Sequence, residues 1–418
     1  YGSWNASGTV TFNNCTMEGN VAYNGNNGFS YNWQGTVNLR NSIVRNTMYG
    51  GSSGIDLQYV TGVNVNYGSK DADAANNTLT GANSTSDPQF TDAANDDYTL
   101  QTGSPAIDAG NSTYAPADDI NDLSRPQGQA DDIGAYEHAN TWDGSSSTDW
   151  GTAANWSENI VPVSGRSPVI ANVTNDPDIT TDVSLEDITI KSGAILDINS
   201  TGSLTLTDDF TNSSGTVNLN SASDAFPSLI VEGTSSGNIT YNRYVNTVGS
   251  GEWDLIGSPV DGLSISSFVT TNTTGTATLP INNTLSPNAY AIGIYDNSNN
   301  TWTNFTTASI GAAGNFDIGK GYQMASVNGG TGLLSFTGTI ATTAQTQAII
   351  DNDAANAGAG RRWSLIANPF PSYIQGNSNA DGSNNFLTVN LAKLHNTYQA
   401  VYGYDADGSG YTVYNNSS

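Results

Sequence analysis

The chain has 418 residues, too many for one ordinary hydrophobic core, so we expect several domains. Its 11 basic and 38 acidic residues give a formal net charge of -27, which disfavours binding to nucleic-acid phosphates and to anionic lipid surfaces. Short alternating apolar runs between Gly, Asn, Ser and Thr predict an all-β chain, and none approaches the roughly 20 apolar residues of a membrane-spanning helix.

The first predicted element is a coil that repeats. Residues 8–20 (GTVTFNNCTMEGN) align with residues 35–47 (GTVNLRNSIVRNT) at a constant offset of 27, and GVNVNY (62–67) is a looser third copy. The offset matches Gly with Gly, apolar with apolar and Asn with Asn at Gly8–Gly35, Val10–Val37, Phe12–Leu39 and Asn14–Asn41. Stacked coils of this kind bury a shared core and let an Asn at one corner bond to the Asn of the next coil. The repeat predicts the end of a parallel β-helix over residues 1–138, with its cap.

The single cysteine, Cys15, lies within the first coil. One cysteine cannot form an internal disulfide, and no basic residue nearby in the sequence would lower the pKa of its thiol. We therefore expect a small buried residue and not a reactive thiol.

Residues 84–138 break the coil repeat, and we expect them to cover the open end of the solenoid. They resemble the closing segment of a family of bacterial right-handed parallel β-helix surface proteins of the choice-of-anchor type. The residues that carry the resemblance are Asp87, Pro88, Phe90, Asp97, Tyr98, SPAIDAG (104–110), Arg125, Pro126 and DIGAYE (132–137). The resemblance implies a right-handed parallel β-helix on a bacterial surface.

The cap is rich in aspartate, which leaves two interpretations open. The carboxylates could form a calcium site or a catalytic group, or they could cap turns and pair with Arg125. The residues concerned are Asp108, Asp118, Asp119, Asp122, Asp131 and Asp132. Asp beside Gly and Pro is typical of turns that its side chain stabilises, so we favour the structural role and assign no catalytic, cofactor or metal residue.

The second predicted domain spans residues 139–236. It begins with three tryptophans among turn-forming residues, Trp142, Trp150 and Trp156, which could stack on sugars or fold inward as a cap; we favour the cap. Short strands such as AILDI and SLTLTDDF, with glycines at the turns, then predict a small β-solenoid or meander. The run from WDG to IVPVSG followed by these strands resembles modules of large proteins exported by the type IX secretion system.

The third predicted domain, residues 237–418, is an internal duplication. GEWDLIGSP (251–259) matches RRWSLIANP (361–369) at an offset of 110, and IYDNSNNTWTNF matches GYDADGSGYTVY at an offset of 109. We expect a strand before Pro259 and before Pro369, and a polar hairpin tip between Tyr404 and Tyr411. The second copy stops before an equivalent of GKGYQMA (319–325), so we expect both chain ends to be interior points of a longer polypeptide. The copies resemble the β-sandwich module that often precedes the type IX sorting signal.

Two loops in this domain resemble the start of a calcium loop, D-x-D-x-S-G at Asp405, Asp407, Ser409 and Gly410 and N-x-N-x-D-G at Asn377, Asn379, Asp381 and Gly382. Neither has the glutamate that the twelfth position needs, so we expect polar turns, with structural calcium as the alternative. The two histidines, His138 and His395, lie in different domains and cannot form a local metal site. Arg361 and Arg362 are expected to pair with surface carboxylates.

Together these features favour a non-enzymatic, secreted or cell-surface chain of a Gram-negative bacterium. We expect an adhesin-like or filament-forming segment of a larger protein, with the type IX machinery as its partner in export and surface polysaccharide or other surface proteins as candidate partners. The alternative is the sugar-binding accessory region of a carbohydrate-active β-helix enzyme, a lyase or hydrolase. A calcium-dependent assembly protein is a third interpretation. Nucleic acid is not an expected partner.

Overall fold

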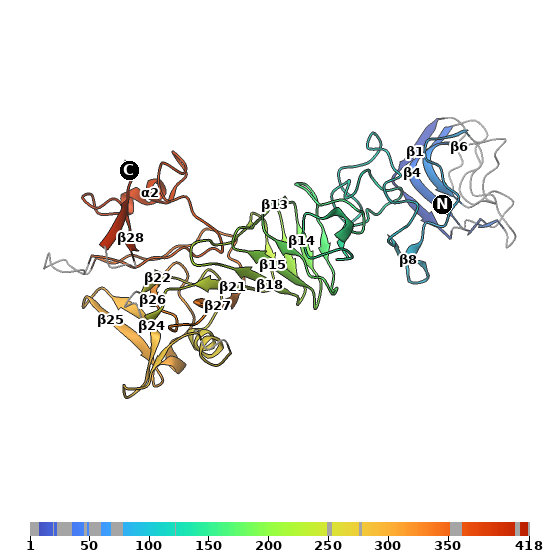
Figure 1. Ribbon diagram of the computed structural model, residues 1–418. Coiled ribbons are helices and arrows are strands. Elements are labelled where there is room, and N and C mark those ends of the chain that lie inside the picture. Colours follow the sequence, from blue (N-terminus) through green and yellow to red (C-terminus); the bar gives the residue numbers. More distant parts are fainter. Residues whose placement is uncertain are drawn as a thin grey trace. The chain divides into compact units, whose positions relative to one another are not determined.

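The protein is described by a computed structural model for residues 8–19, 21–22, 36–45, 48–49, 60–67, 78–121, 123–248, 253–275, 278–351, 362–405 and 410–416 (Figure 1). The chain divides into two compact units, unit 1 (1–147 with 151–169) and unit 2 (148–150 with 170–418). The fold is all-β, as predicted, with parallel solenoid sheets, antiparallel sheets and few short helices. Among the described residues, no helix is long and apolar enough to cross a membrane. The predicted domain boundaries at 138/139 and 236/237 stay a prediction.

Unit 1 contains the predicted parallel coils. Its main sheet runs in the order β1 (Thr9–Asn13), β4 (Thr36–Arg45), β6 (Val60–Tyr67) and β7 (Thr78–Thr80), and β2 (Thr16–Glu18) also pairs with β4. A smaller parallel pair is formed by β3 (Val21–Ala22) and β5 (Met48–Tyr49). Val10 aligns with Val37 and Phe12 with Leu39, so the predicted register is confirmed. The third coil is shorter than predicted, because Val37 aligns with Val60, an offset of 23 and not 27.

The segment after these coils closes them, as its sequence predicts. It contains β8 (Phe90–Asp92), the 3-10 turn η1 (Ala93–Asn95) and β9 (Asp97–Leu100), followed by turns and by β10 (Thr141–Trp142) and η2 (Ala153–Asn155). Buried Ile133 and Ala106 pack with Ile43 of β4 in one apolar cluster. The N–H of Gly134 donates to the main-chain oxygen of Asn41 at 2.9 Å. Cap and coil therefore share both apolar packing and main-chain bonds.

Unit 2 begins with a solenoid whose coils have three faces. One face stacks β12 (Asp178–Ile179), β15 (Ile195–Asn199), β18 (Thr216–Asn220) and β21 (Ile239–Tyr244). The second stacks β13 (Asp182–Leu185), β16 (Ser203–Leu206) and β19 (Ser228–Val231), and the third stacks β14 (Ile188–Ile190), β17 (Phe210–Asn212) and β20 (Ser235–Ser236). A further short strand, β11 (Val169–Ile170), precedes them. Strand side chains alternate between buried and partly exposed, as in β15, so every coil sends its aliphatic residues into a common core.

An antiparallel strand ends this solenoid. β27 (Leu333–Gly338) pairs with β21 over its whole length, with Tyr241 opposite Phe336. The sheet order β12-β15-β18-β21-β27 therefore crosses the predicted boundary at 236/237. β27 covers the edge of β21 and is itself the outer strand of this sheet.

The first copy of the duplicated module forms an antiparallel sheet in the order β22 (Asp254–Ile256), β26 (Tyr322–Met324), β24 (Ala289–Asp296) and β23 (Ile281–Asn282), with β25 (Thr301–Thr306) also paired to β24. Beside it lie α1 (Ile265–Thr270), the π-turn η4 (Thr271–Gly275) and η5 (Ile310–Ala312). The antiparallel sheets fit the predicted sandwich class. The strand predicted before Pro259 is present as β22 and ends at Ile256.

The second copy forms fewer elements, α2 (Phe386–Asn390), η6 (Leu391–Lys393), and the hairpin of β28 (Val401–Asp405) and β29 (Gly410–Tyr414). The predicted hairpin is confirmed, with Tyr404 opposite Tyr411. The prediction of a strand before Pro369 is wrong for the described residues, which begin at residue 362. There Ile366 forms only an isolated bridge to Lys320. The two segments differ in the strand available for pairing. β22 pairs with β26 along its length, whereas the segment before Pro369 bonds only to residues 319–321, which precede β26.

Candidate functional site

The centre of the acidic cap is a buried ion pair. Arg125 Nη1 lies 2.7 Å from Glu137 Oε2, and both side chains are fully buried. We predicted that a cap aspartate would pair with Arg125. That prediction is wrong, because the carboxylate paired with Arg125 is that of Glu137. Arg125 reaches Asp132 only at its main-chain oxygen, at 3.3 Å. Glu137 is the ion-pair partner of Arg125 because its carboxylate is also held by two main-chain hydrogen bonds. It accepts from the N–H groups of Gln127 and Asp132, each at 2.9 Å.

The cap aspartates stabilise turns, as we favoured. Asp119 accepts from the N–H of Asn121, Leu123 and Glu137, at 2.6, 3.0 and 3.0 Å. Asp132 accepts from the N–H of Asp108 and His138, and Asp108 accepts from that of Ala130, at 2.8, 2.6 and 2.8 Å. Asp131 is buried, Asp118 is exposed, and Asp122 lies outside the described residues. In the part of the chain that is described, no three His, Cys, Asp or Glu side chains are arranged to hold a metal ion.

Burial sets the protonation of this cap. It raises the pKa of Glu137 to about 7, although the Asp132 and Gln127 amides and the Arg125 guanidinium act in the opposite direction. Burial, together with the nearby Glu137 charge, also raises the pKa of Asp132 well above its ordinary value. A buried carboxyl with a raised pKa can transfer protons, but these two are held by main-chain N–H groups inside the cap. Their environment fits folding better than catalysis.

The three tryptophans fold inward, which confirms the cap interpretation. Trp142, Trp150 and Trp156 are at most 4% exposed. The rings of Trp142 and Trp156 meet edge to face at 5.1 Å. Buried rings offer no face to a sugar, so a sugar site built on these residues is wrong.

The remaining predicted candidates are turn or surface residues. Asp381 accepts from the N–H groups of Ser383 and Asn384, both at 2.8 Å, and these bonds lower the pKa of its carboxyl. Asn377 accepts from the N–H of Asn379 at 3.2 Å and donates to the main chain of Asn415 at 3.0 Å. In the other loop Asp407 and Ser409 lie outside the described residues, and Gly410 begins β29.

The two histidines, the arginines at 361 and 362, and the cysteine do not form a common site in the described residues. His138 Nδ1 lies 2.9 Å from Glu158 Oε1 in unit 1, and His395 contacts the Tyr398 ring in unit 2. Arg362 pairs loosely with Asp351 at 3.6 Å on the surface, as predicted, and Arg361 lies outside the described residues. Cys15 is half-buried, and burial raises the pKa of its thiol, which opposes formation of the reactive thiolate.

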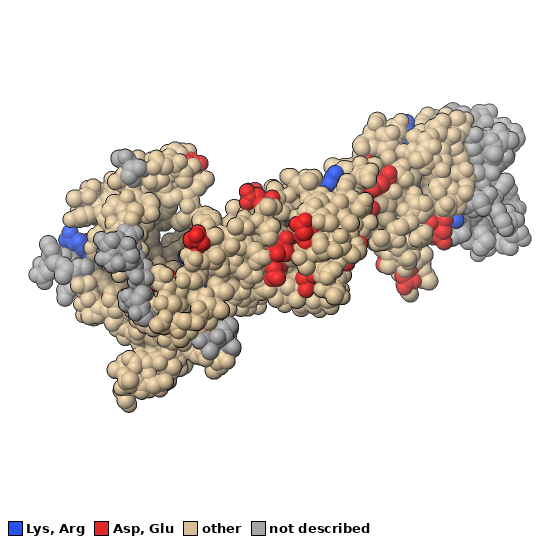
Figure 2. Space-filling model, viewed as in Figure 1, with Lys and Arg blue, Asp and Glu red and all other residues tan. Residues whose placement is uncertain are grey.

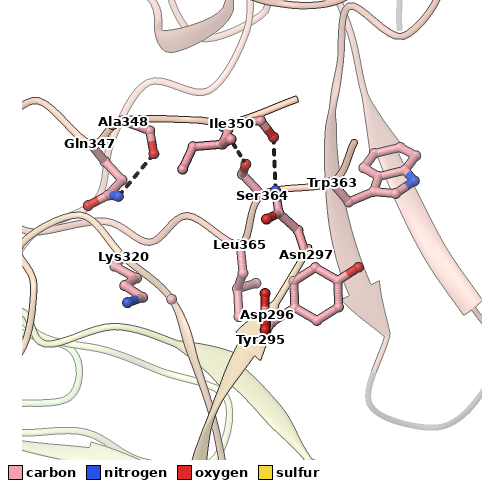
Figure 3. A pocket seen from close by; sticks show the side chains of 11 residues that line it. Tyr295, Asp296, Asn297, Lys320, Gln347, Ala348, Ile350, Trp363, Ser364 and Leu365 are labelled. Atoms are coloured by element: carbon pink, nitrogen blue, oxygen red, sulfur yellow. Dashed lines mark hydrogen bonds between the residues drawn. The ribbon is translucent and has the colours of Figure 1, made fainter. Parts of the chain in front are cut away.

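A pocket that we did not predict lies in unit 2 (Figure 3). Its volume is about 180 Å³, and four segments that are distant in sequence form it. The lining residues are Tyr295, Asp296, Asn297, Lys320, Gly321, Gln347, Ala348, Ile350, Trp363, Ser364 and Leu365. Two hydrogen bonds join the walls: Asn297 donates to the main chain of Ile350 at 2.8 Å, and the Ile350 N–H donates to Ser364 Oγ at 3.3 Å.

The pocket combines aromatic surface with polar groups. Trp363 is 45% exposed and meets Tyr402 edge to face at 4.8 Å, which holds its ring in place. Lys320 lies across Leu365 from Tyr295 in Figure 3, and its ammonium is 3.0 Å from Asp317. Small-molecule pockets commonly measure about 300–1,000 Å³, so this one can hold only a small group or one ring of a longer ligand. Trp363 and Tyr295 both stand in the duplicated motifs, where we interpreted them as repeat markers alone.

The solenoid of unit 2 carries a concentration of acidic side chains, visible in Figure 2. Repulsion from Asp209 and Asp187 raises the pKa of Asp208 at one of its corners. Elsewhere on the solenoid, burial followed by the charge of Asp197 raises the pKa values of Asp176 and Asp178. This surface therefore repels anionic partners.

Comparison with known families gives one result. The model of a family described as Domain of unknown function (DUF8693) matches residues 141–417. The matched residues span the solenoid of unit 2 together with both copies of the duplicated module. No curated protein and no solved structure gives a significant match.

Proposed function

Because the chain belongs to the family described as Domain of unknown function (DUF8693), which names no activity, we propose a function from its structure. The chain is a non-catalytic, adhesin-like spacer within a larger surface protein. Its coils would hold contact surfaces at a set separation, and its biological effect would depend on length and stiffness.

The observation that carries this proposal is a row of side-chain hydrogen bonds along the unit 2 solenoid. Asn199 donates to Asp178, Asn220 to Asn199 at 3.3 Å and Asn242 to Asn220 at 2.8 Å. Ser335 of β27 then donates to Asn242 at 2.7 Å, so the row continues into the closing strand. Each bond links a strand to the next strand of the same face, in addition to the main-chain ladders. Such cross-links oppose bending between neighbouring coils, which suits a spacer.

The proposed location is the outer surface of a Gram-negative bacterium, reached through the type IX secretion machinery. The support is the resemblance of the cap, the tryptophan-containing segment and the duplicated module to exported surface proteins. Export is tested by brief protease treatment of intact source cells, followed by mass spectrometry of released peptides. Peptides of this chain should appear while the cells stay intact; peptides that appear only after lysis would contradict the proposed location.

The adhesin part of the proposal is tested by attachment. Source cells in which the coding region for residues 8–416 is deleted in frame should attach less well to polysaccharide-coated surfaces and to other cells. Unchanged attachment, with the rest of the protein still displayed, would contradict an adhesive role.

A second candidate function, sugar binding, is favoured by the pocket at Trp363. A partly exposed indole beside hydroxyl, amide and ammonium groups is suited to a pyranose ring. A glycan array would test it with the full chain, the variant Trp363→Ala, and the control Tyr373→Ala, which removes an exposed aromatic ring outside the pocket. Binding that is lost only in Trp363→Ala would support this candidate. Binding equal in all three proteins, or none, would contradict it.

A further inference from the structure

The pocket at Trp363 opens beside a strand whose one edge bonds to both copies of the duplicated module. The N–H of Ala325 donates to the main-chain oxygen of Ala291 in β24 at 3.2 Å, and the N–H of Gly321 donates to that of Leu365 in the second copy at 3.1 Å. Residues 321 and 325 are an even number of positions apart, so in an extended strand their N–H groups point to the same side. β24 and the second-copy segment therefore bond to this edge one after the other. Main-chain bonds thus fix two walls of the pocket before any ligand binds.

Polar groups of Gln347 and Lys320 lie at one end of this pocket, and Leu365 lies between them and Trp363 (Figure 3). The side-chain nitrogen of Gln347 donates to the main-chain oxygen of the next residue at 3.1 Å. Among the described residues, its side-chain oxygen accepts no hydrogen bond. The Lys320 ammonium has three donors, and Asp317 takes one of them at 3.0 Å. This end therefore offers a ligand one acceptor and at least one donor beside an apolar side chain.

The carboxylate that lines the pocket, that of Asp296, is used by its own turn. It accepts from the N–H and the hydroxyl of Ser298, at 2.9 and 2.6 Å, and from the side chain of Asn299 at 2.8 Å. It therefore competes poorly for a ligand's hydroxyl groups. The formal net charge of -27 disfavours an anionic ligand, although Lys320 alone would attract one. A neutral ligand fits this balance best.

Among the substituents of neutral sugars, the acetamido group uses all three features of this end at once. Its N–H can donate to Gln347 Oε1, its carbonyl oxygen can accept from the Lys320 ammonium, and its methyl group can contact Leu365. A hydroxyl group at the same ring position would leave the apolar contact unused. The volume of about 180 Å³ also suits one such substituent beside a ring that lies against Trp363.

We propose that the Trp363 pocket selects N-acetylhexosamines, with the acetamido group held by Gln347, Lys320 and Leu365. This inference rests on the second candidate function, sugar binding, and names the class of sugar that the same pocket prefers.

The test compares sugars that differ only in the acetamido group. Isothermal titration calorimetry of the full chain would use two pairs: trimers of N-acetylglucosamine and of glucose with the same linkage, and N-acetylgalactosamine with galactose. In at least one pair the acetylated sugar should bind about tenfold more tightly or better, as expected for a substituent that adds an apolar contact and completes hydrogen bonds.

Gln347→Ala should largely abolish this preference, because it removes the acceptor for the acetamido N–H. The affinity for the sugars without that group should stay unchanged. The matched control is Gln345→Ala, at a residue of the same type outside the pocket, whose side chain donates to the nearby main-chain oxygen of Thr343 at 2.9 Å. This control should keep the full preference.

The possible outcomes separate this inference from sugar binding itself. Equal binding within both pairs overturns the inference, and sugar binding at the pocket still stands if that binding is lost in Trp363→Ala. Binding of none of these sugars, together with a blank glycan array, overturns both. The inference is also overturned if Gln347→Ala keeps the full preference, because the acetamido group would then be held elsewhere.

Discussion

The two solenoids of this chain are stabilised in different ways. The coils of unit 1 differ in length, with offsets of 27 and 23 between aligned strands, and their cap holds a fully buried ion pair. The unit 2 coils are stacked on three faces, and one row of side-chain bonds links successive coils. Unit 1 thus adds one concentrated network in its cap to the Asn bonds between its coils, whereas unit 2 repeats similar interactions in every coil.

This difference predicts different responses to mutation. A concentrated network fails when one member is removed, because the remaining buried charges and N–H groups lose their partners. In a repeated array, a mutation in one coil removes only the stabilisation that this coil contributes, since each coil contacts mainly its neighbours. The mutations below test this contrast, from the largest expected effect to the smallest, and a pH dependence follows them.

Arg125→Ala should have the largest effect. It leaves Glu137 buried without its cation, and breaking a buried pair costs about 3–5 kcal/mol of unfolding free energy. Urea unfolding of the full chain, followed by hydrogen exchange of residues 123–137, measures the change. The control Lys191→Ala, at an exposed unit 2 residue, should stay near zero. A loss below about 1 kcal/mol for Arg125→Ala would show that the cap does not depend on this pair.

Leu219→Ala should cost about 2–5 kcal/mol, the usual range for a buried leucine that leaves a cavity. Leu219 is fully buried in β18 of the unit 2 solenoid. Hydrogen exchange should increase most in β15, β18 and β21, the adjacent coils, and little in unit 1. Equal loss of protection in both units would contradict the independent behaviour of the two arrays.

Asn residues that bond from coil to coil occur in both units, and we expect their mutations to have different effects on stability. Asn41 is fully buried, donates to Asn14 at 3.2 Å, and exchanges bonds with the Asn111 main chain at 2.9 Å. Asn41→Gly keeps its positive φ of 47° but leaves those groups unpaired, at a cost of about 1–3 kcal/mol. Asn220→Ala, half-buried in unit 2, should cost about 0.5–1.5 kcal/mol. Denaturant unfolding of the two variants measures both, and a reversed order would contradict the contrast.

The last prediction is a pH dependence in the cap of unit 1, set by Glu137. The pKa of Glu137 is raised from 4.5 to about 7, so the folded cap binds more protons than the unfolded chain between these values. Stability from this group is complete below about pH 4.5 and falls as the pH rises through 7, by at most about 1.4 kcal/mol per pH unit. Exchange at residues 123–137 should be slower at pH 5.5 than at pH 7.5, after correction for intrinsic rates. The opposite trend would show that the paired carboxylate is favoured on folding.

Repetition decided how much of this fold could be predicted from the sequence. The register of Val10 with Val37 and of Tyr404 with Tyr411 was predictable, because alternating side chains and a constant offset permit few other alignments. The length of the third coil was not, because the loops between parallel strands vary freely. The partner of Arg125 was also not predictable, since several carboxylates lie close in sequence and only the folded cap selects Glu137.

The candidate site shows the same limit. The Trp363 pocket is formed by four segments between residues 295 and 365, and nothing in any one of them signals a common cavity. The tryptophans at 142 and 156 were correctly predicted as a cap because rings that fold inward bury a large apolar area. Local turn chemistry was thus predictable, and long-range convergence was not.

The most direct test of the spacer proposal compares three versions of the source bacterium. One carries the native chain, one lacks the region encoding residues 8–416, and one has that region replaced by an unrelated β-solenoid of matched length. If length and stiffness are the function, the replacement restores attachment to the native level while the deletion does not. If the replacement attaches as poorly as the deletion although it is displayed equally well, specific residues of this chain carry the function and the spacer proposal is contradicted.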